Sequence, residues 1–165
     1  MASLKYGCVT PNAKGREYPV AASQFFPHEG GAFVYLDGSG HILFGLTATA
    51  TLFGYAIVPA GVGVGAAGST YWKSSATAGA DKMFVITDID AEFVVPGNAT
   101  VTAAMAGNAA DLVGVNDGAA AQKVATATST YDVLLIQGRA MDIGAGYATT
   151  DALVKRNPAK VQADT

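Results

Sequence analysis

The stretch MFVITDIDAEFVV, residues 83–95, has the clearest periodicity in the chain. Its apolar residues and its carboxylates fall on opposite parities: Val85, Thr87, Ile89, Ala91, Phe93 and Val95 on one, Asp88, Asp90 and Glu92 on the other. A period of two is typical of a β-strand and does not fit a helix. Because thirteen residues is long for one strand, we expect a bend or bulge within it. Pro96-Gly97 then predicts a turn.

Shorter apolar runs on the N-terminal side of this stretch predict three more strands. Residues 32–36 (AFVYL) and 41–44 (HILF) are separated by Asp37-Gly38-Ser39-Gly40. An Asp-Gly pair between apolar runs is a strong hairpin signal. Residues 52–58 predict the third strand, which ends before Pro59.

The C-terminal side continues in the same manner. Strands are predicted at residues 110–115, 131–136 and 152–155, and Asn116-Asp117-Gly118 predicts a turn. Residues 102–107 fit a single helical turn, with Thr102 as its cap and Gly107 as its stop. Because no segment shows three turns of helical apolar spacing, the sequence predicts an all-β fold with one or two short helices.

The first 31 residues differ from the rest. They show no sustained period, and Pro11, Pro19 and Pro27 interrupt them. We therefore expect residues 1–31 to be an extended N-terminal arm outside the core, and residues 32–165 to be the β domain.

Composition supports this division. Half of the 165 residues are apolar, only 14% are charged and 20 are glycine, which favours short strands and tight turns. Cations against carboxylates number three to two in residues 1–31, four to ten in 32–151 and three to one in 152–165. An acidic body argues against a nucleic-acid partner, whereas its basic ends suit docking on an acidic protein surface.

Cysteine content and hydropathy indicate where the protein is made. Cys8 is the only cysteine, which excludes an internal disulfide and a zinc site of several thiolates. The N-terminus lacks the apolar core of a signal peptide, and no run approaches a membrane span. We expect a protein made in the cytoplasm with no membrane partner.

A glycine-rich stretch, IVPAGVGVGAAGST at residues 57–70, contains the letters of a dinucleotide-binding fingerprint at Gly63, Gly65 and Gly68. Such a site needs a helix directly after the glycines, because the helix N-terminus holds the pyrophosphate. The sequence that follows, STYWKSSATAG, has no apolar stripe. We therefore predict a loop without a cofactor.

Asp88, Asp90 and Glu92 offer oxygen ligands for Ca²⁺ or Mg²⁺. Successive residues on one strand face lie roughly 7 Å apart, however, so a solvated strand face is favoured over a metal site.

For catalysis the chain offers only His28 and His41 as histidines, and it has no nucleophile elbow. A triad of Cys8, His28 and Asn12 would lie in the irregular arm, which lacks the rigid positioning that catalysis requires. We predict no enzyme activity.

Four phrases together resemble the head decoration (cement, or auxiliary capsid) proteins of tailed bacteriophages. They are GGAFVYLDGSGHI, LFGYAIVPAG, SSATAGADKMFVITDIDAEFVVPGNATVTAAMAGNAADLVGVNDG and DALVKRNP, and they span about residues 31–158. The resemblance implies a small β-barrel or β-tulip-like domain, a homotrimer, and attachment to the major capsid protein on the outer surface of the virion. No catalytic residues come with that family.

In this interpretation, cations and aromatics of the N-terminal arm and of the end of the glycine-rich loop contact the partner: Lys14, Arg16, Phe25, Phe26, Tyr71 and Trp72. Two alternatives stay open. One is another virion subunit, such as a head fibre base or a tail tube. The other is a carbohydrate-binding or adhesion module, in which Tyr71 and Trp72 stack on a sugar ring.

Overall fold

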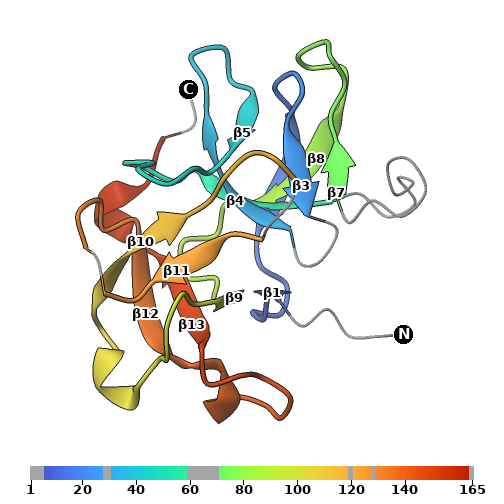
Figure 1. The fold of residues 1–165 in the computed structure, drawn as a ribbon. Helices are drawn as coiled ribbons and strands as arrows, with labels where there is room; N and C mark the ends of the chain where they lie inside the picture. The colour runs from blue at the N-terminus through green and yellow to red at the C-terminus, as the bar shows by residue number, and fades with distance from the viewer. Residues whose placement is uncertain (1–5, 28–30, 59–70, 119–120, 128, 164–165) are drawn as a thin grey trace.

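The computed structural model describes residues 6–27, 31–58, 71–118, 121–127 and 129–163, and strands dominate it (Figure 1). The strands form sheets of six, five and two members, and every strand pair is antiparallel. The helical elements of the described residues are three 3₁₀ turns: η1 (Ala103–Met105), η2 (Ala140–Asp142) and η3 (Pro158–Lys160). The all-β prediction is confirmed.

The five-stranded sheet has the order β2 (Gly15–Pro19), β8 (Lys82–Ile86), β6 (Gly54–Ile57), β4 (Ala32–Leu36) and β5 (Ile42–Phe44). The predicted hairpin at residues 32–44 is confirmed as β4 and β5. The Asp37 carboxylate closes its turn by accepting the N–H groups of Ser39 and His41, at 2.8 and 2.9 Å. The sheet curls so that its two edges approach each other, and a single isolated parallel bridge joins Val20, just after β2, to Ile42 in β5.

The six-stranded sheet has the order β1 (Gly7–Cys8), β9 (Phe93–Pro96), β13 (Asp151–Arg156), β12 (Leu134–Arg139), β10 (Ala109–Val113) and β11 (Lys123–Ala125). It also curls, because Gly97 beyond β9 bridges to Val124 in β11. Neither sheet closes into a complete barrel within the described part of the chain. The barrel or tulip shape implied by the resemblance therefore stays a prediction.

The central strands β4 and β6 of the five-stranded sheet are buried on both faces. In β4, Ala32 and Val34 point into a core enclosed by their own sheet, whereas Phe33 points into a second core shared with the six-stranded sheet. There Phe33, Tyr55 and Phe93 contact one another with ring centroids 4.6–5.2 Å apart. Burial on both faces explains why β4 reads as a continuous apolar run.

Two buried polar side chains join the sheets. The Gln122 amide accepts the Phe33 N–H at 2.6 Å and donates to the carbonyl oxygens of Phe33 and Gly45, both at 2.8 Å. Arg156, only 1% exposed, donates to the carbonyl oxygens of Phe53 and Thr87. Burial lowers the pKa of Arg156 to about 10, so the guanidinium still carries its charge at neutral pH.

The stretch 83–95 is not one bent strand. Its first part is β8 in the five-stranded sheet and its last part is β9 in the six-stranded sheet. Asp88 and Asp90 lie in the turn between them, where the Asp88 carboxylate accepts the N–H groups of Lys14 and Asp90 at 3.3 and 3.1 Å. The prediction of a solvated strand face is therefore wrong, because the carboxylates belong to a turn and the residue that follows it.

The predicted N-terminal arm is also corrected within residues 6–27. This segment contributes β1, β2 and β3 (Phe25–Pro27) to the three sheets. Tyr18, Val20 and Phe26 are 7%, 1% and 0% exposed, and they belong to the core inside the five-stranded sheet. The segment is thus part of the domain.

Four more predicted strands are confirmed, with shifted ends: residues 52–58 as β6, 110–115 as β10, 131–136 as β12 and 152–155 as β13. Strands β7 (Tyr71–Lys73) and β11 were not predicted. The helical turn near 102–107 is η1. The Thr102 side chain does not cap it, and Gly107 follows it with φ of +89°.

Candidate functional site

Strands β3 and β7 form a separate two-stranded ribbon, beside β8 in Figure 1. Phe26 pairs with Trp72 in this ribbon, and both side chains face inward, 0% and 8% exposed. The Phe26 ring packs on both Trp72 and Phe44, with centroids about 6 Å apart. The inner side of the ribbon therefore completes the core of the five-stranded sheet.

The opposite side of the ribbon carries Phe25, Tyr71 and Lys73, and we call these three residues the ribbon face. The rings of Phe25 and Tyr71 meet edge to face at 5.2 Å. Lys73 is exposed, and its Nζ atom lies 5.1 Å from the centre of the Phe25 ring. Cation–π geometry of this kind keeps an ammonium group and two half-buried rings together at the surface.

The turn predicted at residues 116–118 packs against the ribbon and holds it in place. The Asn116 side chain accepts the N–H of Phe25 at 2.8 Å. Gly118 has φ of +72°, and a Cβ atom there would lie 2.6 Å from the Tyr71 ring. Glycine is needed at this position both for the backbone conformation and for the close approach of the ring.

The structure brings together only part of the predicted contact residues. Phe25 and Tyr71 share the ribbon face. The prediction that Phe26 and Trp72 contact a partner is wrong. Side chains alternate along the two paired strands, so both residues point into the core, where they cannot contact a partner or stack on a sugar.

Lys14 and Arg16 lie apart from the ribbon face, before and within the edge strand β2. Both residues are exposed. The Arg16 guanidinium lies 4.8 Å from the centre of the Tyr18 ring, and its Nε donates to the Tyr18 hydroxyl at 2.6 Å.

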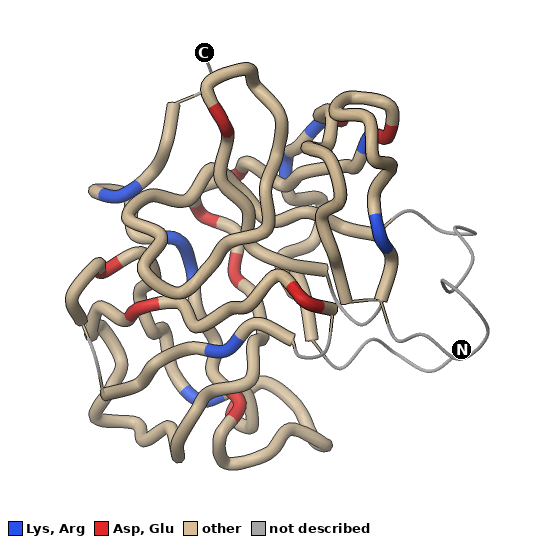
Figure 2. The backbone as a smooth tube through the Cα atoms, turned by 45° about the horizontal axis from the view of Figure 1, so that its top comes forward, with Lys and Arg blue, Asp and Glu red and all other residues tan. Residues whose placement is uncertain are grey.

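The basic ends and acidic middle of the sequence do not form separate charged regions in the folded chain. Figure 2 shows cationic and acidic positions interspersed over the molecule. The basic C-terminal segment includes Arg156, which is buried between the sheets. The expectation that both chain ends present cations for docking is thus wrong for Arg156.

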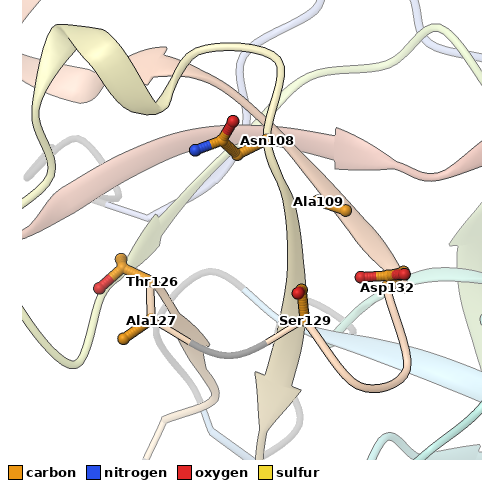
Figure 3. Close-up of a pocket in the computed structure, with 6 residues that line it drawn as sticks. All are labelled: Asn108, Ala109, Thr126, Ala127, Ser129 and Asp132. Atoms are coloured by element: carbon orange, nitrogen blue, oxygen red, sulfur yellow. The ribbon is translucent and has the colours of Figure 1, made fainter.

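A second feature is a hollow of about 410 Å³ beside β10 and β12, lined by Asn108, Ala109, Thr126, Ala127, Ser129 and Asp132 (Figure 3). The loop before β12 is held by Asp111, which is 7% exposed. The Asp111 carboxylate accepts the N–H groups of Thr130, Tyr131 and Asp132, at 2.9, 2.7 and 2.9 Å. Burial acts to raise the pKa of Asp111, but the three donors outweigh it and hold the pKa below its ordinary value.

Asp132 itself has an unusual backbone conformation, with φ of +58°. Its carbonyl oxygen accepts from the Asn157 side chain at 2.7 Å, so both its N–H and its C=O are fixed. Its Oδ1 atom is buried and has no hydrogen-bond partner within the described residues. Sequence alone gives no signal for this site, because it depends on Asp111 and Asn157, which are distant in the chain.

The other sites considered from sequence are placed as follows. The glycines at 63, 65 and 68, and His28, lie outside the described residues. Burial raises the pKa of Cys8, so its thiol is protonated at neutral pH. Within the described ranges, no three His, Cys, Asp or Glu side chains are grouped closely enough to hold a metal ion.

No protein-family model, curated protein or solved structure matches the chain. None of the helical elements in the described residues has the length and apolar character needed to cross a membrane.

Proposed function

We propose that the protein is a structural protein of a phage virion that binds the outer surface of the capsid through its ribbon face and has no catalytic role. The observation that carries the proposal is the ribbon itself. Its inner side is anchored in the core, and its outer side carries two half-buried aromatic rings beside an exposed lysine. The sequence resemblance supplies the identity of the partner, the major capsid protein.

The chemistry of the ribbon face suits an acidic protein surface. Aromatic rings contribute contact area with little loss of conformational entropy, and they are enriched where binding energy is concentrated. Lys73 adds a charge that attracts carboxylates. Because β3 and β7 are paired and backed by Asn116, the face is preorganised, which lowers the entropic cost of docking.

Co-sedimentation with undecorated capsids, assembled from the major capsid protein of the same genome, tests the proposal. We expect Phe25→Ala to weaken binding tenfold or more, which corresponds to about 1.4 kcal/mol. Lys73→Ala should produce a smaller loss that shrinks as salt is raised.

Matched controls are available on β8, where Phe84 is 41% exposed and Lys82 is also exposed. Phe84→Ala and Lys82→Ala should leave binding unchanged. If these variants weaken binding as much as the ribbon variants do, the ribbon face is not the contact. If the unaltered protein fails to bind capsids, the proposed function itself is wrong.

The resemblance also implies a homotrimer. Light scattering on the purified protein should give a mass near three times 16.7 kDa. A monomer in solution that also stays monomeric on capsids would contradict this part of the proposal.

A further inference from the structure

The Asp132 carboxylate is held where its hydrogen-bonding capacity is unused. Its backbone is fixed in the left-handed region by Asp111 on one side and Asn157 on the other. Asp tolerates this region better than most residues, but the conformation still costs energy. A buried acceptor without a partner adds a further cost. The loop therefore holds this carboxylate in the lining of the hollow at a cost in folding free energy.

Other polar groups around the hollow are also unengaged. The side chains of Asn108 and Ser129 are exposed and make no hydrogen bond within the described residues. Thr126 differs, because its hydroxyl already donates to the Asn98 side chain at 3.3 Å. The hollow therefore offers a carboxylate acceptor, an amide that donates and accepts, and a hydroxyl that does both.

This set of groups distinguishes among ligand classes. A calcium ion takes six to eight oxygen ligands, usually with several carboxylates, and among the described lining residues Asp132 alone carries a carboxylate. An ammonium group would leave the donors of Asn108 and Ser129 unused. A ligand that carries several hydroxyl groups can use every donor and acceptor.

Size favours the same class. A volume of about 410 Å³ lies in the range of roughly 300–1,000 Å³ found for small-molecule sites, and it greatly exceeds the space that a single ion needs. We propose that the Asp132 hollow is a binding site for a neutral saccharide, with hydroxyl groups donating to the Asp132 carboxylate and accepting from Asn108. The site is separate from the ribbon face and does not depend on the proposed capsid role.

The described lining contains no aromatic ring, so the sugar has no stacking platform. Binding then rests on hydrogen bonds that compete with water, and each contributes only modestly. We expect dissociation constants in the millimolar range. The carbohydrate function that the sequence suggested for Tyr71 and Trp72 would, in this proposal, lie at a different place in the fold.

The test is a titration of the ¹⁵N-labelled full chain with methyl glycosides of glucose, galactose, mannose and N-acetylglucosamine, followed by amide chemical shifts. We expect saturable shifts at Asn108, Ser129 and Asp132 with at least one sugar. Asp132→Asn should weaken that binding tenfold or more, because it removes the charged acceptor while Asn accepts the same backbone conformation.

Asp90→Asn makes the same chemical change at an exposed turn and should bind sugar like the unaltered protein. Asp132→Gly provides a second variant that tolerates positive φ, so the fold persists even if Asn perturbs the loop. The proposal is overturned if no sugar shifts these amides, or if both Asp132 variants bind sugar at full strength. It is also overturned if Ca²⁺ alone, and no sugar, saturates the site.

Discussion

Replacing Asp111 with Asn probes the interaction that organises the loop before β12. The two side chains have nearly the same shape, so the substitution creates no cavity and changes the charge alone. In the folded protein the Asp111 carboxylate is almost fully buried and accepts three backbone N–H groups.

The size of the effect follows from these contacts. Hydrogen bonds to a charged group contribute about 1.5–3 kcal/mol each, and neutral ones about 1 kcal/mol. Asn keeps one oxygen, which can still accept from Tyr131 and Asp132 as a neutral group, but it turns an NH₂ toward the N–H of Thr130. One charge-assisted bond is lost and two are weakened. We expect the free energy of unfolding to fall by about 3 kcal/mol.

The dependence on pH gives a second readout. Because the pKa of Asp111 is lowered on folding, its contribution is fully present above the unfolded-state pKa of about 3.9 and is lost as pH falls through the lower folded-state pKa. Urea unfolding of the two proteins should therefore differ most at neutral pH. The difference should narrow below pH ~4, as the unaltered carboxylate becomes protonated.

Asp88 is the matched control, because its carboxylate also accepts two backbone N–H groups but lies in the turn between β8 and β9, where it is only partly buried. Asp88→Asn should cost less than about 1 kcal/mol. The reasoning is refuted if Asp111→Asn unfolds with the same free energy as the unaltered protein at neutral pH. A loss that stays constant from neutral to acidic pH would equally contradict it.

Three further predictions concern the core and the N-terminal segment. Arg156→Lys should lower the free energy of unfolding by about 2 kcal/mol in guanidinium titrations, because a single ammonium cannot serve the carbonyl oxygens of both Phe53 and Thr87; an unchanged midpoint would contradict it. Deletion of residues 1–24 should abolish cooperative thermal unfolding in calorimetry, since it removes β1, β2 and the buried Tyr18 and Val20; a truncated chain with a normal transition would return this segment to the status of an arm. Trp72 is the only tryptophan and is 8% exposed, so its fluorescence should resist quenching by iodide, and quenching as efficient as that of a free indole would place the ring at the surface.

The hairpin at residues 32–44 could be predicted because its information is local. Apolar runs flank a turn whose residues supply both the positive φ of Gly40 and the Asp37 acceptor. No distant part of the chain is needed to specify it.

The stretch 83–95 misled the prediction for a physical reason. Alternation reports which residues are buried, but it does not report into which core they point. Val85 points into the core of the five-stranded sheet, whereas Phe93 and Val95 point into the core shared by the two larger sheets. The turn between them carries the same alternation of apolar and acidic residues, so the break in the strand leaves no mark on the pattern.

Residues 6–27 escaped prediction because their strands are short and β2 is an edge strand. In β2 only Tyr18 is buried, and the charges and proline around it are typical of a protected sheet edge. The ribbon was likewise hidden, since β3 and β7 are three residues each and come from distant parts of the sequence. The pairing of adjacent aromatics, one inward and one outward, could have been inferred only if both segments had first been recognised as strands.

The place of β13 in its sheet has a consequence for biosynthesis. Strand β13 lies between β9 and β12, yet it is made after β10, β11 and β12 have already left the ribosome. Until β13 emerges, β9 lacks the neighbour that joins it to the rest of the six-stranded sheet. The carbonyl oxygens of Phe53 and Thr87 also lack their hydrogen-bond donor, Arg156. Closure by a strand that is made after its neighbours requires contacts between distant parts of the chain, which slows folding. It also leaves the apolar edge of β9 uncovered in the nascent chain until β13 is in place.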